Sequence, residues 1–203
     1  MTTPRLLERL WNERKYPQLI DLLRAGRADL DPAVATRLTG PTAAAALAVI
    51  RLDELGQSLH PFASVAIRAL IASQQPDGGW GDLAVTAMAL RALRCSRGTG
   101  HVVTRGMQFL AAMQKPAGAW PTEPIRRLPA DPALTAFILL HLAGDGDLAR
   151  LARVDEALDW LHRHRCEIAP ETRPWVDRAT ARWRRAATVT RSAAPLFAQV
   201  SWS

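Results

Sequence analysis

An eleven-residue stretch occurs twice in this chain, with a spacing of forty residues between corresponding positions. The first copy, residues 70–80, reads LIASQQPDGGW, and the second, residues 110–120, reads LAAMQKPAGAW. Six pairs of positions are identical in the two copies, among them Leu70/Leu110, Gln74/Gln114, Pro76/Pro116, Gly78/Gly118 and Trp80/Trp120. Similarity at a fixed spacing predicts a structural unit that recurs along the chain and buries its apolar face against the next copy.

A second marker, the dipeptide Thr-Ala, recurs with a similar period. It begins apolar segments at Thr42, Thr86 and Thr135, and is found in a weaker form at Thr180. Three segments are apolar on nearly every side: residues 42–50, 83–93 and 133–143. Three others are amphipathic: residues 62–74, 103–114 and 150–165. The first kind predicts buried helices, and the second predicts helices with one face in water.

This alternation, with no run of alternating residues typical of strands, predicts an all-α fold. One inner and one outer helix per repeat is the pattern of an α/α toroid, and a linear solenoid of the same hairpins remains open as an alternative. We expect a single domain over residues 1–203, with the best repeat match over 40–145 and a degenerate repeat over 150–190. Residues 192–203 are expected to form a flexible tail.

The glutamine–tryptophan stretch is interpreted as a clamp between hairpins. Gly78 and the glycines beside it allow a tight reversal with positive φ. Gln74 can bond backbone groups at the terminus of the next helix, and Trp80 adds a large buried area. The second copy offers the same residues for these roles: Gln114, Gly118 and Trp120. Such groups hold helices together, so the chemistry must come from elsewhere.

The segment Arg105-Gly106-x-x-Phe109-Leu110-x-x-x-Gln114-x-x-x-Gly118-x-Trp120 resembles the repeat of squalene–hopene cyclases and related terpene cyclases. Protein prenyltransferase β-subunits carry a related repeat. The resemblance implies an α/α toroid, here short or incomplete compared with the full barrel of the family. It also implies a terpene-cyclase-like protein of the isomerase or lyase class that binds or cyclises a linear isoprenoid in an apolar cavity.

Cyclases of this kind, as the resemblance implies, protonate their substrate with the middle aspartate of a DxDD motif. The equivalent stretch here is DPALTA, residues 131–136, in which Ala133 and Leu134 stand at the positions of the acid and its partner. Asp131 matches the first aspartate and is the remaining candidate catalytic residue. A helix cap is the alternative interpretation, because the helix dipole stabilises an anion at this position.

Substrate-binding candidates come from the buried helices and from the C-terminal basic segment. His141 is the unusual polar group of a nearly apolar helix, and it is interpreted either as a satisfied core histidine or as a contact that lines a cavity. The candidates are His141, Thr135, Thr86, Phe137, Met88, Arg182 and Arg185.

The C-terminal helix carries two stripes at helical spacing. Trp175, Ala179 and Trp183 form an apolar stripe, and a basic stripe lies beside it: Arg178, Arg182 and Arg185. The basic stripe is either a solvated face or a site for an anion, such as a diphosphate head group, an acidic lipid or nucleic acid. The net charge of +7 gives little support to nucleic acid, because 24 of the 26 basic residues are arginine, a bias typical of a GC-rich bacterial genome.

No metal or cofactor is expected. Prenyltransferase β-subunits, as the resemblance implies, bind zinc through an Asp-x-Cys pair and a distant histidine, and neither Cys95 nor Cys166 has that aspartate. The two cysteines form no CxxC pair and are expected to be reduced in a cytoplasmic protein. The N-terminal residues lack the apolar run of a signal peptide.

Two further interpretations remain beside the isoprenoid one. The chain is alternatively a non-catalytic helical-repeat scaffold or subunit, whose ring is completed by a partner protein or by a second copy. Nucleic-acid binding is the weakest alternative, and contact with a membrane surface stays open.

Overall fold

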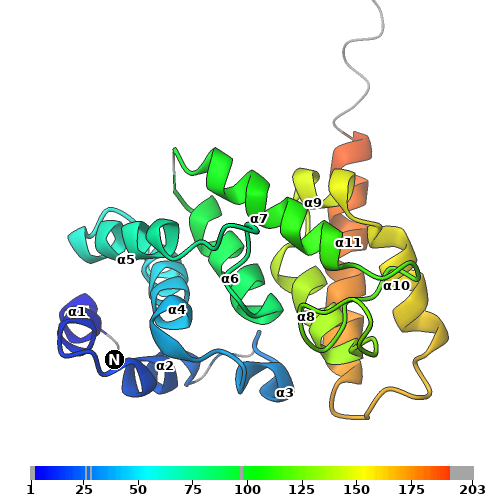
Figure 1. The fold of residues 1–203 in the computed structure, drawn as a ribbon, viewed down its shortest axis with the longest axis horizontal. Coiled ribbons are helices and arrows are strands. Elements are labelled where there is room, and N and C mark those ends of the chain that lie inside the picture. The colour runs from blue at the N-terminus through cyan, green and yellow to red at the C-terminus, as the bar shows by residue number, and fades with distance from the viewer. Residues whose placement is uncertain (1–2, 26, 28, 97, 193–203) are drawn as a thin grey trace, which may run out of the picture.

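The computed structural model describes residues 3–25, 27, 29–96 and 98–192, with side chains as far as residue 188. The described part is all-helical and contains no strand, only an isolated bridge between Pro121 and Ala130, which confirms the predicted fold class (Figure 1). The helices are α1 (Pro4–Asn12), α2 (Tyr16–Arg24), α3 (Pro32–Ala35), α4 (Gly40–Glu54), α5 (Pro61–Ala72), α6 (Leu83–Arg94), α7 (Gly100–Met113), α8 (Pro132–His141), α9 (Gly146–Leu151), α10 (Val154–Arg163) and α11 (Arg173–Ser192). The predicted tail, apart from residue 192, lies outside the described residues.

Helices α4, α6, α8 and α11 follow one another across the molecule, each packed against the next (Figure 1). Helices α4, α6 and α8 are buried over most of their length, as expected of segments that are apolar on nearly every side. The amphipathic helices α5 and α7 cover α4 and α6 on one side. This order of buried and half-exposed helices is compatible with the predicted toroid.

The two copies of the repeated stretch make matching hydrogen bonds. In the first, the Nε2 group of Gln74 donates to the carbonyl oxygens of Gly78 (2.8 Å) and Val102 (2.9 Å), the latter in the first turn of α7. In the second, the Nε2 group of Gln114 donates to the carbonyl oxygen of Arg153 (2.9 Å), the residue that precedes α10. Each glutamine therefore ties its turn to the start of the next outer helix.

The tryptophans add a further hydrogen bond to each copy of the repeated stretch. Each indole N–H donates to a carbonyl ten residues earlier, from Trp80 to Leu70 and from Trp120 to Leu110, both at 2.8 Å. Gly118 has a φ of +91°, and a Cβ at this position would lie 2.5 Å from the backbone nitrogen of Ala157. Only glycine satisfies both the conformation and the close approach of α10.

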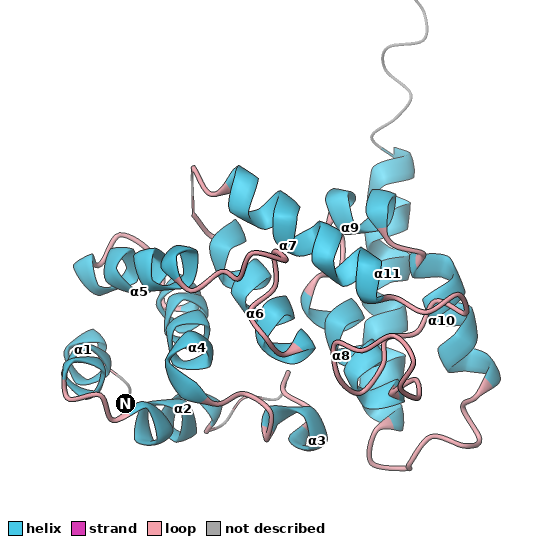
Figure 2. Cartoon of the chain, viewed as in Figure 1, coloured by secondary structure: helices cyan, strands magenta, loops and turns pink. Residues whose placement is uncertain are grey.

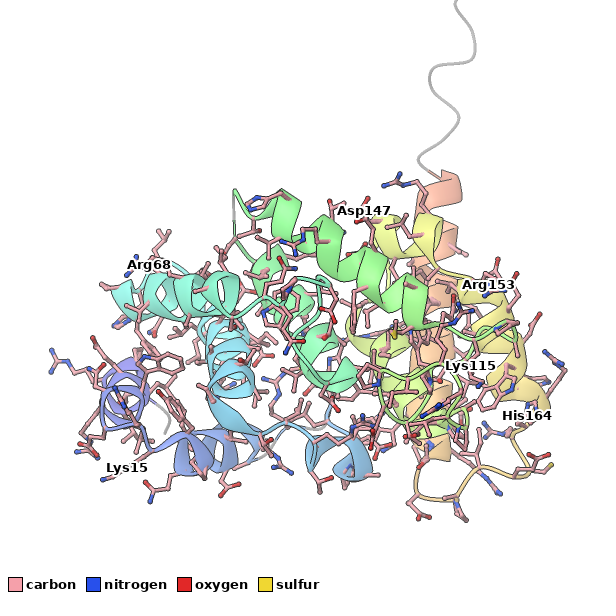
Figure 3. The ribbon with its side chains drawn as sticks, in the orientation of Figure 1. Lys15, Arg68, Lys115, Asp147, Arg153 and His164 are labelled. Atoms are coloured by element: carbon pink, nitrogen blue, oxygen red, sulfur yellow. The ribbon has the colours of Figure 1, made fainter. Side chains whose placement is uncertain are left out.

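An arginine completes each clamp. Arg105 on α7 donates to the carbonyl oxygen of Pro76 (2.9 Å), and Arg153 donates to those of Lys115 (3.1 Å) and Pro116 (3.0 Å). Lys115 and Arg153 are labelled in Figure 3. The clamps thus fix the connections that precede α6 and α8, including residues 114–131, which Figure 2 draws as loop.

No helix in the described part of the chain is both long enough and apolar enough to cross a membrane.

Candidate functional site

A pocket of about 550 Å³ lies where α4 and α6 end and α11 passes beside them. Its lining is dominated by arginine: Arg27, Arg51, Arg91, Arg178, Arg182 and Arg185, together with Asp29, Glu54, Leu140 and Ala181. We call it the arginine pocket. Six guanidinium groups against two carboxylates leave its lining with a net charge of +4. This excess makes the pocket attractive to an anion.

The first wall of the arginine pocket is a network of ion pairs centred on Arg27, whose side chain is only 7% exposed. Its guanidinium group donates two hydrogen bonds to Asp29 (2.9 and 2.8 Å) and two to Glu54 (3.1 and 2.8 Å). Arg91 on α6 donates to Asp29 as well, at 2.7 Å. Burial by itself would raise the pKa of Asp29, but the hydrogen bonds from Arg27 and Arg91 hold that pKa well below its usual range.

The second wall is α11. Its apolar side faces the core, because Ala179 and Trp183 are buried and the indole N–H of Trp183 donates to the carbonyl oxygen of Leu139 (2.7 Å). Its basic side lines the pocket. Arg182 donates to the carbonyl oxygen of Leu140 (3.1 Å), near the end of α8. Among the described residues, no carboxylate lies within ion-pair distance of Arg182 or Arg185.

His141 contacts the first wall of the arginine pocket through Arg91. Its Nδ1 atom lies 2.7 Å from the Nη1 atom of Arg91, and its ring packs on Phe137 with 4.2 Å between centroids. Burial, with the nearby charge of Arg91, lowers the pKa of His141 to about 3, so the imidazole is neutral at neutral pH. A neutral Nδ1 accepts the guanidinium N–H. His141 lines a smaller pocket of about 190 Å³ next to Arg91, and not the arginine pocket itself.

Asp131 lies at the opposite end of the buried helices. Its Oδ1 atom accepts from the backbone N–H of Leu134 (3.0 Å) and caps α8. Its Oδ2 atom lies 3.7 Å from Arg37, which also bonds Asp82, the cap of α6, at 2.6 Å. These contacts are those of a helix cap. They give no support to the predicted catalytic role, although Asp131 does line a pocket of about 480 Å³ with Arg37 and Asp82.

Asp31, which the sequence interpretation did not single out, is a buried carboxyl close to this end. One of its oxygens caps α3 by accepting from Ala33 (2.8 Å), and the other has no hydrogen-bond partner within the described part of the chain. Burial raises the pKa of Asp31. It does not line the pocket beside Asp131.

Four predicted substrate contacts lie in the packed interior instead: Thr86, Met88, Thr135 and Phe137. The hydroxyl groups of Thr86 and Thr135 accept from the backbone N–H groups of Trp80 (3.1 Å) and Trp120 (3.0 Å). Their place in the fold is therefore with the clamps. None of the four lines the arginine pocket or the pocket at Asp131, and their assignment as substrate contacts stays a prediction.

Five charged residues of the arginine pocket were not predicted as site residues: Arg27, Asp29, Arg51, Glu54 and Arg91. One signal for three of them is present in the sequence. Arg51, Glu54 and Arg91 each occur in the last turn of a helix that is otherwise almost entirely apolar. Charged side chains that end an otherwise apolar helix indicate either solvent or an ion-pair partner at that end. The described residues contain no group of three or more histidine, cysteine, aspartate or glutamate side chains that could hold a metal ion.

Comparison with known proteins gives one informative relative. The chain is 32% identical over 182 residues to a drimenyl diphosphate synthase from Streptomyces showdoensis. The match covers 82% of this chain but 33% of the relative, so the chain spans about a third of the relative's length. No known family model matches. The similarity supports the predicted relation to terpene cyclases, and the assignment of the repeats to that family stays a prediction.

Proposed function

We propose that this chain is a terpene-cyclase-like protein that binds an isoprenoid diphosphate and holds the diphosphate in the arginine pocket. The observation that carries the proposal is the set of six arginines around one pocket at the ends of α4 and α6. The name of the similar enzyme, a drimenyl diphosphate synthase, supports the same class of ligand.

Guanidinium groups suit this ligand because their paired N–H groups match the geometry of phosphate oxygens. In the proposed complex, Arg182 and Arg185 bind the diphosphate from α11, while Asp29 and Glu54 keep Arg27 and Arg91 in place on the opposite wall. The pocket therefore has one wall that is fixed by its own ion pairs and one wall with charge available for a ligand.

The isoprenoid tail would leave the pocket past its two apolar side chains, Leu140 and Ala181. This proposal places the ligand in the arginine pocket and not in a cavity between the buried helices, whose side chains belong to one core cluster. Cyclisation further needs an acid that can protonate carbon. Asp131 accepts a hydrogen bond from Leu134 and lies beside Arg37, and neither contact supports that step.

The test compares farnesyl diphosphate with farnesol in native mass spectrometry and calorimetry, followed by product analysis. Farnesyl diphosphate should bind and farnesol should bind at least tenfold more weakly, because only the first carries the charge that the pocket attracts. The double variant R182Q/R185Q should lose binding of the diphosphate. Arg68→Gln is the matched control, since Arg68 is exposed on α5 on the outside of the molecule (Figure 3). Equal binding of both compounds, or no binding of either, would refute the proposal.

A non-catalytic subunit is the second candidate, favoured by apolar side chains exposed on and near α5. Leu59 is 99% exposed, and three partly exposed residues lie near it in the chain: Leu55, Val65 and Ile71. Exposed apolar side chains are enriched at protein-binding surfaces. This candidate predicts self-association or capture of a partner that is weakened by Leu59→Ser and unaffected by R182Q/R185Q, measured by light scattering after size-exclusion chromatography.

A further inference from the structure

The two carboxylates of the arginine pocket are the groups that a divalent metal ion would use there. Magnesium bound with a diphosphate prefers one or two carboxylate oxygens as its protein ligands. In the described part of the pocket these can come only from Asp29 and Glu54. Whether the carboxylates are available therefore decides how a diphosphate can be held.

Both carboxylates are already engaged. The two oxygens of Asp29 accept from Arg27, and Oδ2 accepts from Arg91 in addition. Both oxygens of Glu54 accept from Arg27, and Oε2 also lies 3.5 Å from Arg51. A metal ion at either carboxylate would have to compete with guanidinium groups that are bound in paired hydrogen bonds, among the strongest that side chains form.

The positive charge that a metal ion would supply is available from Arg182 and Arg185 on the α11 wall of the pocket. Arg182 uses one of its N–H groups on the carbonyl of Leu140, and a guanidinium group has five. Arg185 lines the same pocket one turn further along α11. Neither has a carboxylate within ion-pair distance among the described residues. The charge that a diphosphate needs is thus supplied by side chains.

Building on the proposed function, we infer that the arginine pocket binds a diphosphate without a divalent metal ion. Asp29 and Glu54 serve to fix the orientation of Arg27 and Arg91, and the arginines of both walls neutralise the ligand directly. Magnesium, which forms a complex with free diphosphate and lowers its charge, should then leave binding unchanged or weaken it.

The experiment measures the affinity of the full chain for inorganic pyrophosphate and for farnesyl diphosphate by calorimetry, once with EDTA and once with excess magnesium. We expect binding of both compounds in EDTA, no tighter binding in magnesium, and about a hundredfold weaker binding in R182Q/R185Q, since each charged hydrogen bond lost corresponds to roughly a factor of ten. Arg68→Gln should behave as the unchanged chain, and circular dichroism of the double variant verifies its fold.

The possible failures can be told apart. Binding of farnesyl diphosphate that requires magnesium would overturn the inference and leave the proposed function standing. Absence of binding in both conditions would remove the proposed function, and the inference with it. Metal-free binding that persists in R182Q/R185Q while the fold is intact would also overturn the inference, because the ligand would then lie outside the arginine pocket.

Discussion

The two ends of the buried helices obey the same electrostatic rule but differ in what they leave available. At the N-terminal ends, Asp82 and Asp131 cap α6 and α8, and at the C-terminal ends arginines gather beside α4 and α6. Both arrangements complement the helix dipole. The N-terminal carboxylates, however, are used by backbone N–H groups and by Arg37, whereas the arginines at the other end outnumber their carboxylates. Capacity for a ligand therefore lies at the C-terminal end.

The largest effect on stability is expected from removing the charge of Asp29, which belongs to the ion-pair network at the C-terminal end. Asp29→Asn keeps the shape of the side chain but removes one of the two carboxylates that compensate Arg27, whose side chain is 7% exposed. Arg27 keeps Glu54 as its partner, so the loss of Asp29 should lower the free energy of unfolding by about 2 kcal/mol, allowing for the partial exposure of both carboxylates. Urea denaturation measures this loss. A change below about 0.5 kcal/mol would show that the network does not hold the wall in place.

His141 makes the same end sensitive to pH. The pKa of His141 is lowered from an ordinary 6.5 to about 3, so below pH 6.5 the unfolded chain binds a proton that the folded chain does not. Stability should therefore fall as the pH decreases from 6.5 towards 3, by about 2 kcal/mol between neutral pH and pH 5 from this residue alone. Asp29, whose pKa is held below its usual range, loses its contribution only under more acidic conditions.

Unfolding at several pH values measures this dependence, with His141→Asn as the comparison. Asparagine can accept from Arg91 without titrating, so the variant should lose most of the slope between pH 7 and pH 5. An unchanged slope in His141→Asn would show that another group titrates in this range.

A smaller effect is expected at the N-terminal end from Arg37→Gln. Arg37 bridges Asp82 and Asp131, but all three side chains are partly exposed, so its loss should cost about 1 kcal/mol or less of unfolding free energy. Diphosphate affinity should stay the same, because Arg37 lies at the other end of the helices. Weaker diphosphate binding in Arg37→Gln would place the ligand at the N-terminal ends of the helices and would contradict the assignment of the anion site to the C-terminal end.

The contrast between the ends also shows what could be predicted from sequence. Helical periodicity and apolar segments were sufficient for the fold class and for the buried helices, because those properties are local. The basic stripe of α11 was visible for the same reason. Arg27 and Asp29 could not be placed, since they lie in a connection without regular structure and Asp29 meets Arg91 only through packing across 62 residues of sequence. The hydrogen bonds of Thr86 and Thr135 could not be predicted, because burial of a hydroxyl does not reveal which backbone group it bonds.

The smallest effect on stability, and the most informative about catalysis, is expected from Asp131→Asn. Asparagine caps a helix about as well as aspartate, and the contact with Arg37 is long and partly exposed, so the free energy of unfolding should change by about 0.5 kcal/mol or less. Diphosphate binding should not change. Any turnover of farnesyl diphosphate detected for the unchanged chain should also persist, because the geometry gives Asp131 the role of a cap.

Asp31→Asn is the matched comparison at this end, since Asp31 is a buried cap whose pKa is raised by burial. If turnover disappears in Asp131→Asn while binding and fold are retained, Asp131 is the acid and the N-terminal end is a reaction centre. If turnover disappears in Asp31→Asn alone, a carboxyl kept protonated by burial supplies the proton, and the division between the two ends becomes one between an acid and an anion site. Turnover that persists in both variants excludes these two carboxyls as the proton donor.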